Sequence, residues 1–211
     1  MPQFQTVLVC ESTENGSDKR LLEELIQKHF LLQAGNYKIK PTGSIDDVKE
    51  FLKFGLITKS YIVSRETERV LVIIDSDKNP RQRFIEVKNC FDTKKFKVQQ
   101  SISSILPHSL NKINVGIYLF PDRQNPGSLE TLCLKTLKHN RLSSKLTCVE
   151  QYMACISNLD GRMTANNKSK SKFRVFMATP KPDRYVDCII DHTDFNSAEF
   201  NSLKDFIKQA Q

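Results

Sequence analysis

Acidic side chains follow several of the buried hydrophobic runs in this sequence. They are Glu11, the pair Asp75 and Asp77, and Asp122. Ligands of an open parallel sheet bind beyond the carboxyl ends of its strands, so we expect these side chains to converge there. Grouped carboxylates repel one another unless a hard cation joins them, and Mg²⁺ takes a few such oxygens while keeping water and substrate phosphate in its shell. The pattern predicts a Mg²⁺ (or Mn²⁺) site.

The spacing within Asp75-Ser76-Asp77 adds to this hypothesis. Alternate residues of an extended segment point the same way, so both carboxylates can face one ion. The alternative is that the acids are structural or solvated, since acidic residues are common where strands enter loops. Acids at three strand ends favour the metal site over that alternative.

Other kinds of catalytic site find little support. The histidines, His29, His108, His139 and His192, are not spaced as metal ligands. The sequence contains neither the Gly-x-Ser-x-Gly turn of a serine nucleophile nor the Gly-x-x-x-x-Gly-Lys-Ser/Thr loop of a P-loop ATPase. The six cysteines are scattered without a Cys-x-x-Cys pair, which predicts buried, reduced thiols in a cytosolic protein.

Strands and helices alternate along the first two thirds of the chain. Continuous apolar runs predict buried strands at 6–10, 70–74 and 113–120, with further strands at 37–40 and 94–101. Helical spacing and capping residues predict helices at 18–34, after Ser44, from Pro80 and at 128–138. Such alternation predicts an α/β fold, with a mostly parallel sheet flanked by helices.

The last third is expected to be a helical C-terminal extension. We divide the chain into an α/β core at 1–140 and an extension at 141–211 that packs on it as one structural unit. The segment from Asp160 to Lys172 is turn-prone and basic and is the best candidate for a mobile loop. Phe173 to Met177 fits a helix or a strand, and an amphipathic helix follows near 198–208.

Bulk composition agrees with a soluble, cytoplasmic globular protein. The 211 residues are 39% hydrophobic and 27% charged, and no apolar stretch approaches the ~18 residues that cross a membrane. The formal net charge of +8 would attract polyanions, which makes nucleic acid a candidate partner. Many basic proteins bind no nucleic acid, so charge alone is weak evidence.

The order of acidic strand ends resembles the Toprim domain of topoisomerases, primases and related nucleases. Val70 to Asp77, Val115 to Asp122 and Gly127-Ser128-Leu129-Glu130 look like small stand-alone Toprim proteins. These are related to the nuclease domain of overcoming-lysogenisation-defect (OLD) proteins. The similarity covers most of the chain and implies a Toprim-like, Rossmannoid fold with C-terminal helices.

The resemblance also implies roles for individual residues. Glu11 would be the family glutamate, a general acid/base or metal ligand, and Asp75 and Asp77 would hold Mg²⁺. Glu130 and Asp122 would complete a second metal position. The family commonly has Glu-Gly-x-x-Asp, whereas this chain has a longer loop from Glu11 to Asp18. Asp18 is then either a substitute ligand or only a helix cap, and Glu14 is another substitute.

Lys170 and Lys172 are candidate phosphate-binding residues, with a solvated lysine-serine run as the alternative. The resulting hypothesis is a Mg²⁺-dependent Toprim nuclease that hydrolyses phosphodiester bonds of DNA or RNA, with phage defence as its implied setting. The alternative is a non-catalytic nucleic-acid-binding or regulatory subunit that works with a separate ATPase or other partner. A receiver-like phosphoacceptor is a third interpretation, but it lacks a clear lysine after a late strand.

Overall fold

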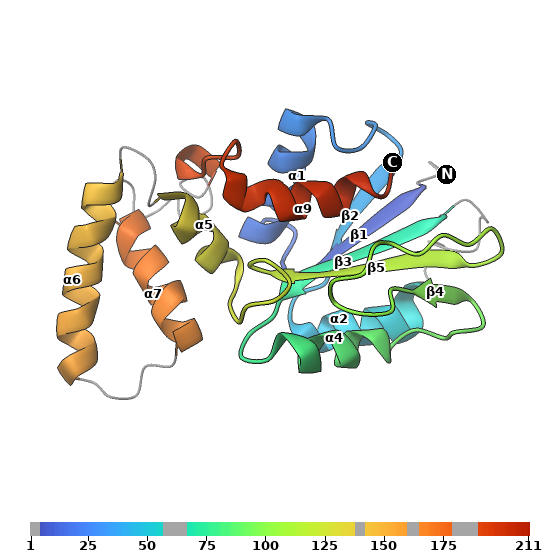
Figure 1. Ribbon diagram of the computed structural model, residues 1–211, viewed down its shortest axis with the longest axis horizontal. Helices are drawn as coiled ribbons and strands as arrows, with labels where there is room; N and C mark the ends of the chain where they lie inside the picture. Colours follow the sequence, from blue (N-terminus) through green and yellow to red (C-terminus); the bar gives the residue numbers. More distant parts are fainter. Residues whose placement is uncertain (1–4, 57–66, 138–141, 160–164, 179–189) are drawn as a thin grey trace.

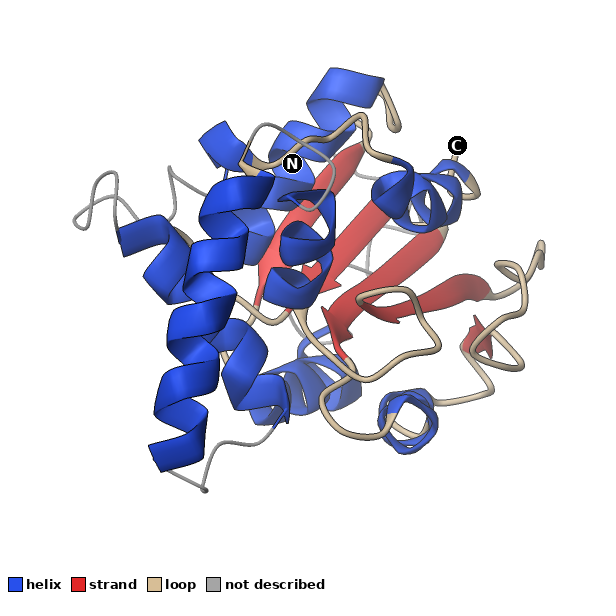
Figure 2. Ribbon diagram, turned by 60° about the vertical axis from the view of Figure 1, so that its left-hand side comes forward, coloured by secondary structure: helices blue, strands red, loops and turns tan. Residues whose placement is uncertain are grey.

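The buried hydrophobic runs form one five-stranded parallel sheet in the computed structural model. The structure describes residues 5–56, 67–137, 142–159, 165–178 and 190–211. The strands are β1 (Thr6–Cys10), β2 (Tyr37–Pro41), β3 (Arg69–Asp75), β4 (Phe96–Val98) and β5 (Ile113–Phe120). Their order is β2-β1-β3-β5-β4, and every pairing between them is parallel (Figure 2).

Helices cover both faces of this sheet. The helices are α1 (Ser17–His29), α2 (Ile45–Glu50), the π-helix η1 (Phe51–Gly55), α4 (Pro80–Lys88), α5 (Leu129–Leu137), α6 (Ser143–Leu159), α7 (Ala165–Ala178), the 3₁₀ turn η3 (Ala198–Phe200) and α9 (Asn201–Lys208). Figure 1 shows α1 and α9 on one face of the sheet and α2 and α4 on the other. The prediction of an α/β class with a flanked parallel sheet and C-terminal helices is confirmed.

Successive strand residues alternate between two hydrophobic clusters. Leu8, Leu71 and Tyr118 pack with α1, α5 and α9 on one face. Val9 and Val72 pack with α2, η1 and α4 on the other face. Because helices cover both faces of the sheet, the central strands consist of continuous hydrophobic residues instead of alternating polar and apolar ones.

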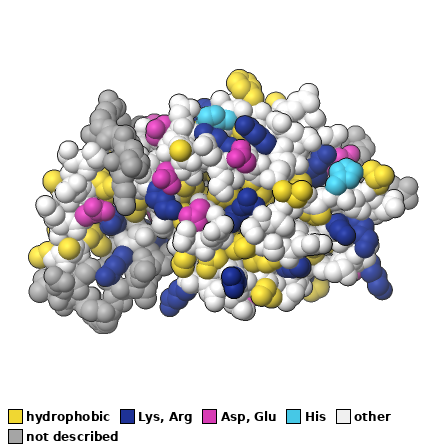
Figure 3. All heavy atoms as spheres, viewed as in Figure 1, with side chains coloured by type: hydrophobic (Ala, Val, Ile, Leu, Met, Phe, Trp, Pro, Cys, Tyr) yellow, Lys and Arg dark blue, Asp and Glu magenta, His cyan; other side chains and the backbone are white. Residues whose placement is uncertain are grey.

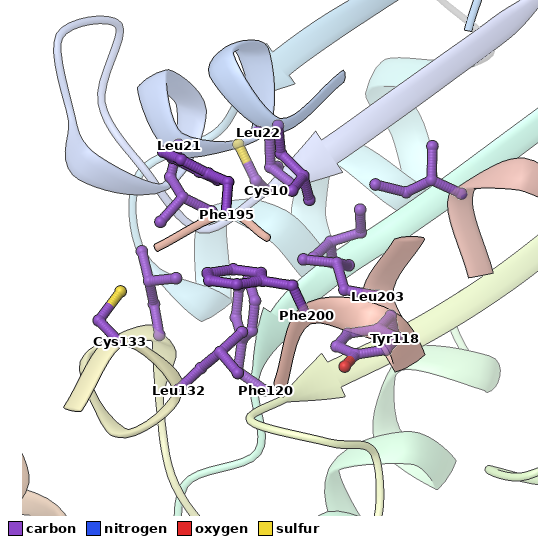
Figure 4. Close-up of a cluster of buried hydrophobic side chains, with 14 of the residues drawn as sticks. Cys10, Leu21, Leu22, Tyr118, Phe120, Leu132, Cys133, Phe195, Phe200 and Leu203 are labelled. Atoms are coloured by element: carbon purple, nitrogen blue, oxygen red, sulfur yellow. The ribbon is translucent and has the colours of Figure 1, made fainter. Parts of the chain in front are cut away.

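The C-terminal helices pack into the first of these clusters. Phe200 and Leu203 lie against Tyr118 and Phe120 of β5 (Figure 4). Gly116 permits this close approach, since a Cβ there would stand 2.9 Å from Phe206 Cε2. The helices therefore share a core with the sheet, while the proposed boundary near residue 140 stays a prediction.

Two local predictions are wrong. Helix α1 ends at His29 instead of 34, because Phe30 adopts a left-handed conformation (φ 49°) and Leu31 turns back into the core. The expected mobile loop is helical from Ala165 onward, since α7 packs against α5 and α6 and buries Phe173 and Phe176. The rest of that predicted loop, 160–164, lies outside the described residues. Phe173 to Met177 is helix, which resolves the open alternative.

Among the described residues, no helix is long and apolar enough to span a membrane. Cys10, Cys90 and Cys133 are buried as expected, but Cys148 and Cys155 are exposed on α6. These two thiols lie where α6 faces solvent, so the expectation of buried thiols is wrong for them.

The packing of α9 on β5 predicts a large stability effect for Phe206→Ala. Phe206 is fully buried, and its ring centroid lies 5.4 Å from that of Tyr118. We expect its truncation to lower the free energy of unfolding by about 3–5 kcal/mol, because a cavity forms at the sheet. Urea unfolding measures this, with the exposed Asp205→Ala on the same helix as the control. Equal effects of the two substitutions would contradict the packing described.

Candidate functional site

The connections that follow β1 and β3 lead to opposite sides of the sheet. The chain leaves β1 through α1 to reach β2 on one side, and it leaves β3 through α4 to reach β4 on the other. Adjacent parallel strands with diverging connections leave a crevice beyond their carboxyl ends, where ligands of such sheets bind. Glu11 follows β1 and Asp75 ends β3, so both stand at this switch point.

Asp75 is the most buried carboxylate at the switch point, with 7% of its surface exposed. Its Oδ1 accepts a hydrogen bond from the Leu129 backbone N–H at 3.0 Å, and its Oδ2 lies 3.0 Å from Lys170 Nζ. Burial raises the pKa of Asp75 to about 6, although Lys170 opposes this shift. Residues from α5 and α7 therefore hold one carboxylate at the end of β3.

The charges around Asp75 also act on Glu11. Burial, followed by repulsion from Asp75 and Asp77, raises its pKa to about 7, while Arg83 and Lys170 pull the pKa down. Its Oε2 is buried and has no hydrogen-bond partner among the described residues. A carboxyl group in this state can hold or release a proton near neutral pH.

Asp77 does not share an extended segment with Asp75, so that prediction is wrong. Its backbone is left-handed (φ 53°), and its N–H donates to the Gly127 carbonyl at 3.1 Å. The bridge to Gly127 turns the chain, and the Asp77 carboxylate pairs with Arg83 of α4. Asp77 still contributes to the field at Glu11.

Asp18 belongs to the same acidic cluster. The prediction that it caps α1 is wrong, because Gly16 is the N-cap residue and Asp18 lies in the first turn. Burial, and then repulsion from Asp75 and Glu130, raises the pKa of Asp18 well above its usual value. Glu130, in the first turn of α5, also acts on Lys170. We call Glu11, Asp18, Asp75, Asp77 and Glu130 the acidic cluster.

Three predicted site residues bind other groups. Asp122 lies 2.8 Å from Lys135 and accepts hydrogen bonds from its own turn; burial opposes the shift, but these partners lower its pKa to about 2. Glu14 is exposed and pairs with Lys19 at 2.8 Å. Lys172 pairs with Glu150 of α6 at 2.9 Å, whereas Lys170 alone of the two predicted lysines contacts the acidic cluster.

Arg83 is a site residue that sequence reasoning missed. It contacts Asp77 and lies 3.6 Å from Glu86, so it neutralises the second carboxylate of the Asp75-Ser76-Asp77 segment. The sequence signal that could have found Arg83 is its position three residues after Pro80, in the first turn of the helix that follows the end of β3.

The described part of the chain contains no group of three or more His, Cys, Asp or Glu residues arranged to hold a metal ion. Lys170 on Asp75 and Arg83 on Asp77 provide positive charge instead. The donor chemistry nevertheless suits a hard cation, because the cluster offers only carboxylate oxygens and Glu11 Oε2 is an unpaired acceptor.

Comparison with known families places the chain. A family model described as "Protein of unknown function (DUF3226)" matches residues 5–211. The chain belongs to this family. Neither the curated proteins nor the solved structures contain a match.

The raised pKa of Glu11 predicts a pH dependence of stability. Between pH 4.5 and about 7 the folded state keeps a proton on Glu11 that the unfolded chain releases. The folded state then binds more protons, so the free energy of unfolding falls as pH rises through this window. Glu11→Gln is expected to reduce this fall.

Urea unfolding in EDTA at several pH values measures the effect. Glu14→Gln is the matched control, since Glu14 is exposed and outside the acidic cluster, and it should keep the wild-type slope. An unchanged slope in Glu11→Gln would show that Glu11 titrates normally.

Proposed function

We propose that this protein hydrolyses phosphodiester bonds of nucleic acid with the help of Mg²⁺ or Mn²⁺. The observation that supports this most is the acidic cluster at the switch point of a parallel sheet, with one lysine reaching into it. Lys170 Nζ lies 3.0 Å from Asp75 Oδ2, which brings positive charge to the carboxylates. The formal net charge of +8 favours a polyanionic substrate.

Asp75, Asp77 and Glu11 are the residues that would hold the metal. They offer hard oxygen donors, and the unpaired Oε2 of Glu11 is an acceptor in need of a partner. When bound, the ion would supply an activated water and charge stabilisation for the phosphate. Asp18 and Glu130 are the better candidates for a second metal position, because repulsion from Glu130 contributes to the raised pKa of Asp18.

Glu11 is suited to move the proton. Its pKa of about 7 lies near the pH at which a general acid or base works best, and its cause is burial beside two aspartates. The Leu129 N–H fixes Asp75 through a 3.0 Å hydrogen bond, which orients its other oxygen. Lys170 would contact a non-bridging phosphate oxygen and stabilise charge there.

The Toprim resemblance agrees with this proposal in the order of its acids. The family aspartate after the glutamate is displaced in the sequence, and we propose Asp18, not Glu14, as its substitute. Repulsion from Glu11 contributes to the raised pKa of Asp18, whereas Glu14 is bound to Lys19 on the surface.

The experiment is a cleavage assay on labelled single- and double-stranded DNA and RNA, with Mg²⁺, Mn²⁺ or EDTA. We expect metal-dependent cleavage that drops by at least ~100-fold in Glu11→Gln, Asp75→Asn and Lys170→Gln. Asp46→Asn is the control, because Asp46 is exposed on α2. Mg²⁺ should also raise the melting temperature of the wild type but not of Asp75→Asn.

Failure of the folded wild type to cut any substrate under these conditions would reject the proposal. Cleavage that survives Asp75→Asn would assign the activity to a contaminant or another site.

A second candidate is a non-catalytic nucleic-acid-binding or regulatory subunit that works beside a separate ATPase. The two pairs Lys170–Asp75 and Arg83–Asp77 favour it, because they neutralise the central carboxylates without a metal. In that case Asp75→Asn should leave nucleic-acid affinity unchanged or raise it, since negative charge is removed. Mobility-shift titrations in EDTA test this, and a large loss of affinity would exclude it.

A further inference from the structure

The opposite end of the sheet carries a basic depression. It has a volume of about 760 Å³, and its lining includes Arg69, Lys94, Lys95, His108, Lys112 and Asn114. Four cationic side chains and a single carboxylate, Glu68, line it. It lies where β3 and β5 begin, and β3 is seven residues long from Arg69 to Asp75, so roughly 20 Å separates it from the acidic cluster.

The walls of the basic depression are held by the sheet itself. Arg69 and Asn114 are register partners on β3 and β5. The Ile113 N–H donates to the Lys95 carbonyl at 3.1 Å, and Lys112 Nζ donates to the Thr93 carbonyl at 2.7 Å. These bonds bring the turn before β4 beside the start of β5, so the cationic side chains surround one preformed depression.

Charge in the depression is unbalanced. Glu68 pairs with Arg69 at 3.3 Å, which leaves the lysine charges without an acidic counterpart in its lining. Figure 3 shows Lys and Arg side chains with a histidine at this end of the molecule. A concave surface lined by one sign of charge concentrates anions.

The lining also offers apolar and hydrogen-bonding contacts. Leu110 is 91% exposed and lines the depression, so its apolar side chain is accessible to a ligand bound there. Asn114 is buried, donates to the Ser109 carbonyl at 3.3 Å, and keeps an Oδ1 without a hydrogen-bond partner among the described residues. Phosphate alone would use the charges but neither Leu110 nor this acceptor.

We propose that the basic depression binds a nucleotide, with its phosphates on the lysines and its base against Leu110. The bounded volume suits a small ligand, since pockets for such ligands span roughly 300–1,000 Å³. It favours a nucleotide over a nucleic-acid strand, which would follow an extended groove. The inference does not rest on the proposed phosphodiester hydrolysis, because the depression shares no residue with the acidic cluster.

Calorimetric titration of the full chain with ATP, tripolyphosphate and a single-stranded oligonucleotide tests the proposal. EDTA is present to exclude metal binding at the acidic cluster. We expect ATP to bind, and the double variant Lys95→Glu/Lys112→Glu to weaken it by at least about tenfold. The control with equal charge change is Lys53→Glu/Lys208→Glu, exposed lysines outside the depression, which should stay close to wild type.

Leu110→Ser separates base from phosphate recognition. Because Leu110 is exposed, its replacement should not disturb folding. We expect this substitution to weaken ATP binding by about threefold or more and to leave the affinity for tripolyphosphate unchanged.

Three outcomes would overturn the proposal. The first is that the folded protein shows no saturable binding of ATP. The second is that both charge variants lose ATP affinity equally. The third is that the protein binds the oligonucleotide but not ATP. Equal effects of Leu110→Ser on ATP and tripolyphosphate would reject contact with the base.

Discussion

Burial of both faces of the parallel sheet is the constraint on which the other features depend. Each central strand contributes side chains to one hydrophobic cluster above and another below. Polar groups are therefore confined to the strand ends, where backbone and side chains can meet solvent or ligands. The acidic cluster lies at one end of the sheet and the basic depression at the other, so the two concentrations of opposite charge are kept apart by a dry core.

Other elements bring compensating groups to the acidic cluster. Helix α7 supplies Lys170, helix α4 supplies Arg83, and the start of α5 supplies the Leu129 N–H. Even so, burial keeps the pKa of Asp75 at about 6 and that of Glu11 at about 7. The remaining repulsion would be relieved by a bound proton or by a cation.

Local sequence was sufficient for much of the fold and for the core of the site. Continuous apolar runs identified the buried strands, and the helix starts after Ser44 and at Pro80 were correctly placed. The same logic predicted that Glu11 and Asp75 follow buried strands and converge at one edge of the sheet, whereas the pairing of β1 with β3 comes from the structure. It was wrong where tertiary packing overrode local preference, as in the lysine-serine run that packs as helix α7.

The sequence by itself determined which residues are buried in strands and which carboxylates follow them, because hydrophobic period and strand length are local properties. Only the tertiary structure decided that Asp18 joins the acidic cluster, that Asp122 turns to Lys135, and that Lys170 instead of Lys172 reaches Asp75. The choice between the two lysines depends on the rotation of α7 about its axis, which directs Lys170 to Asp75 and Lys172 to Glu150. Contacts between residues 95 positions apart, such as Asp75 and Lys170, leave no period or spacing in the chain from which they could be predicted.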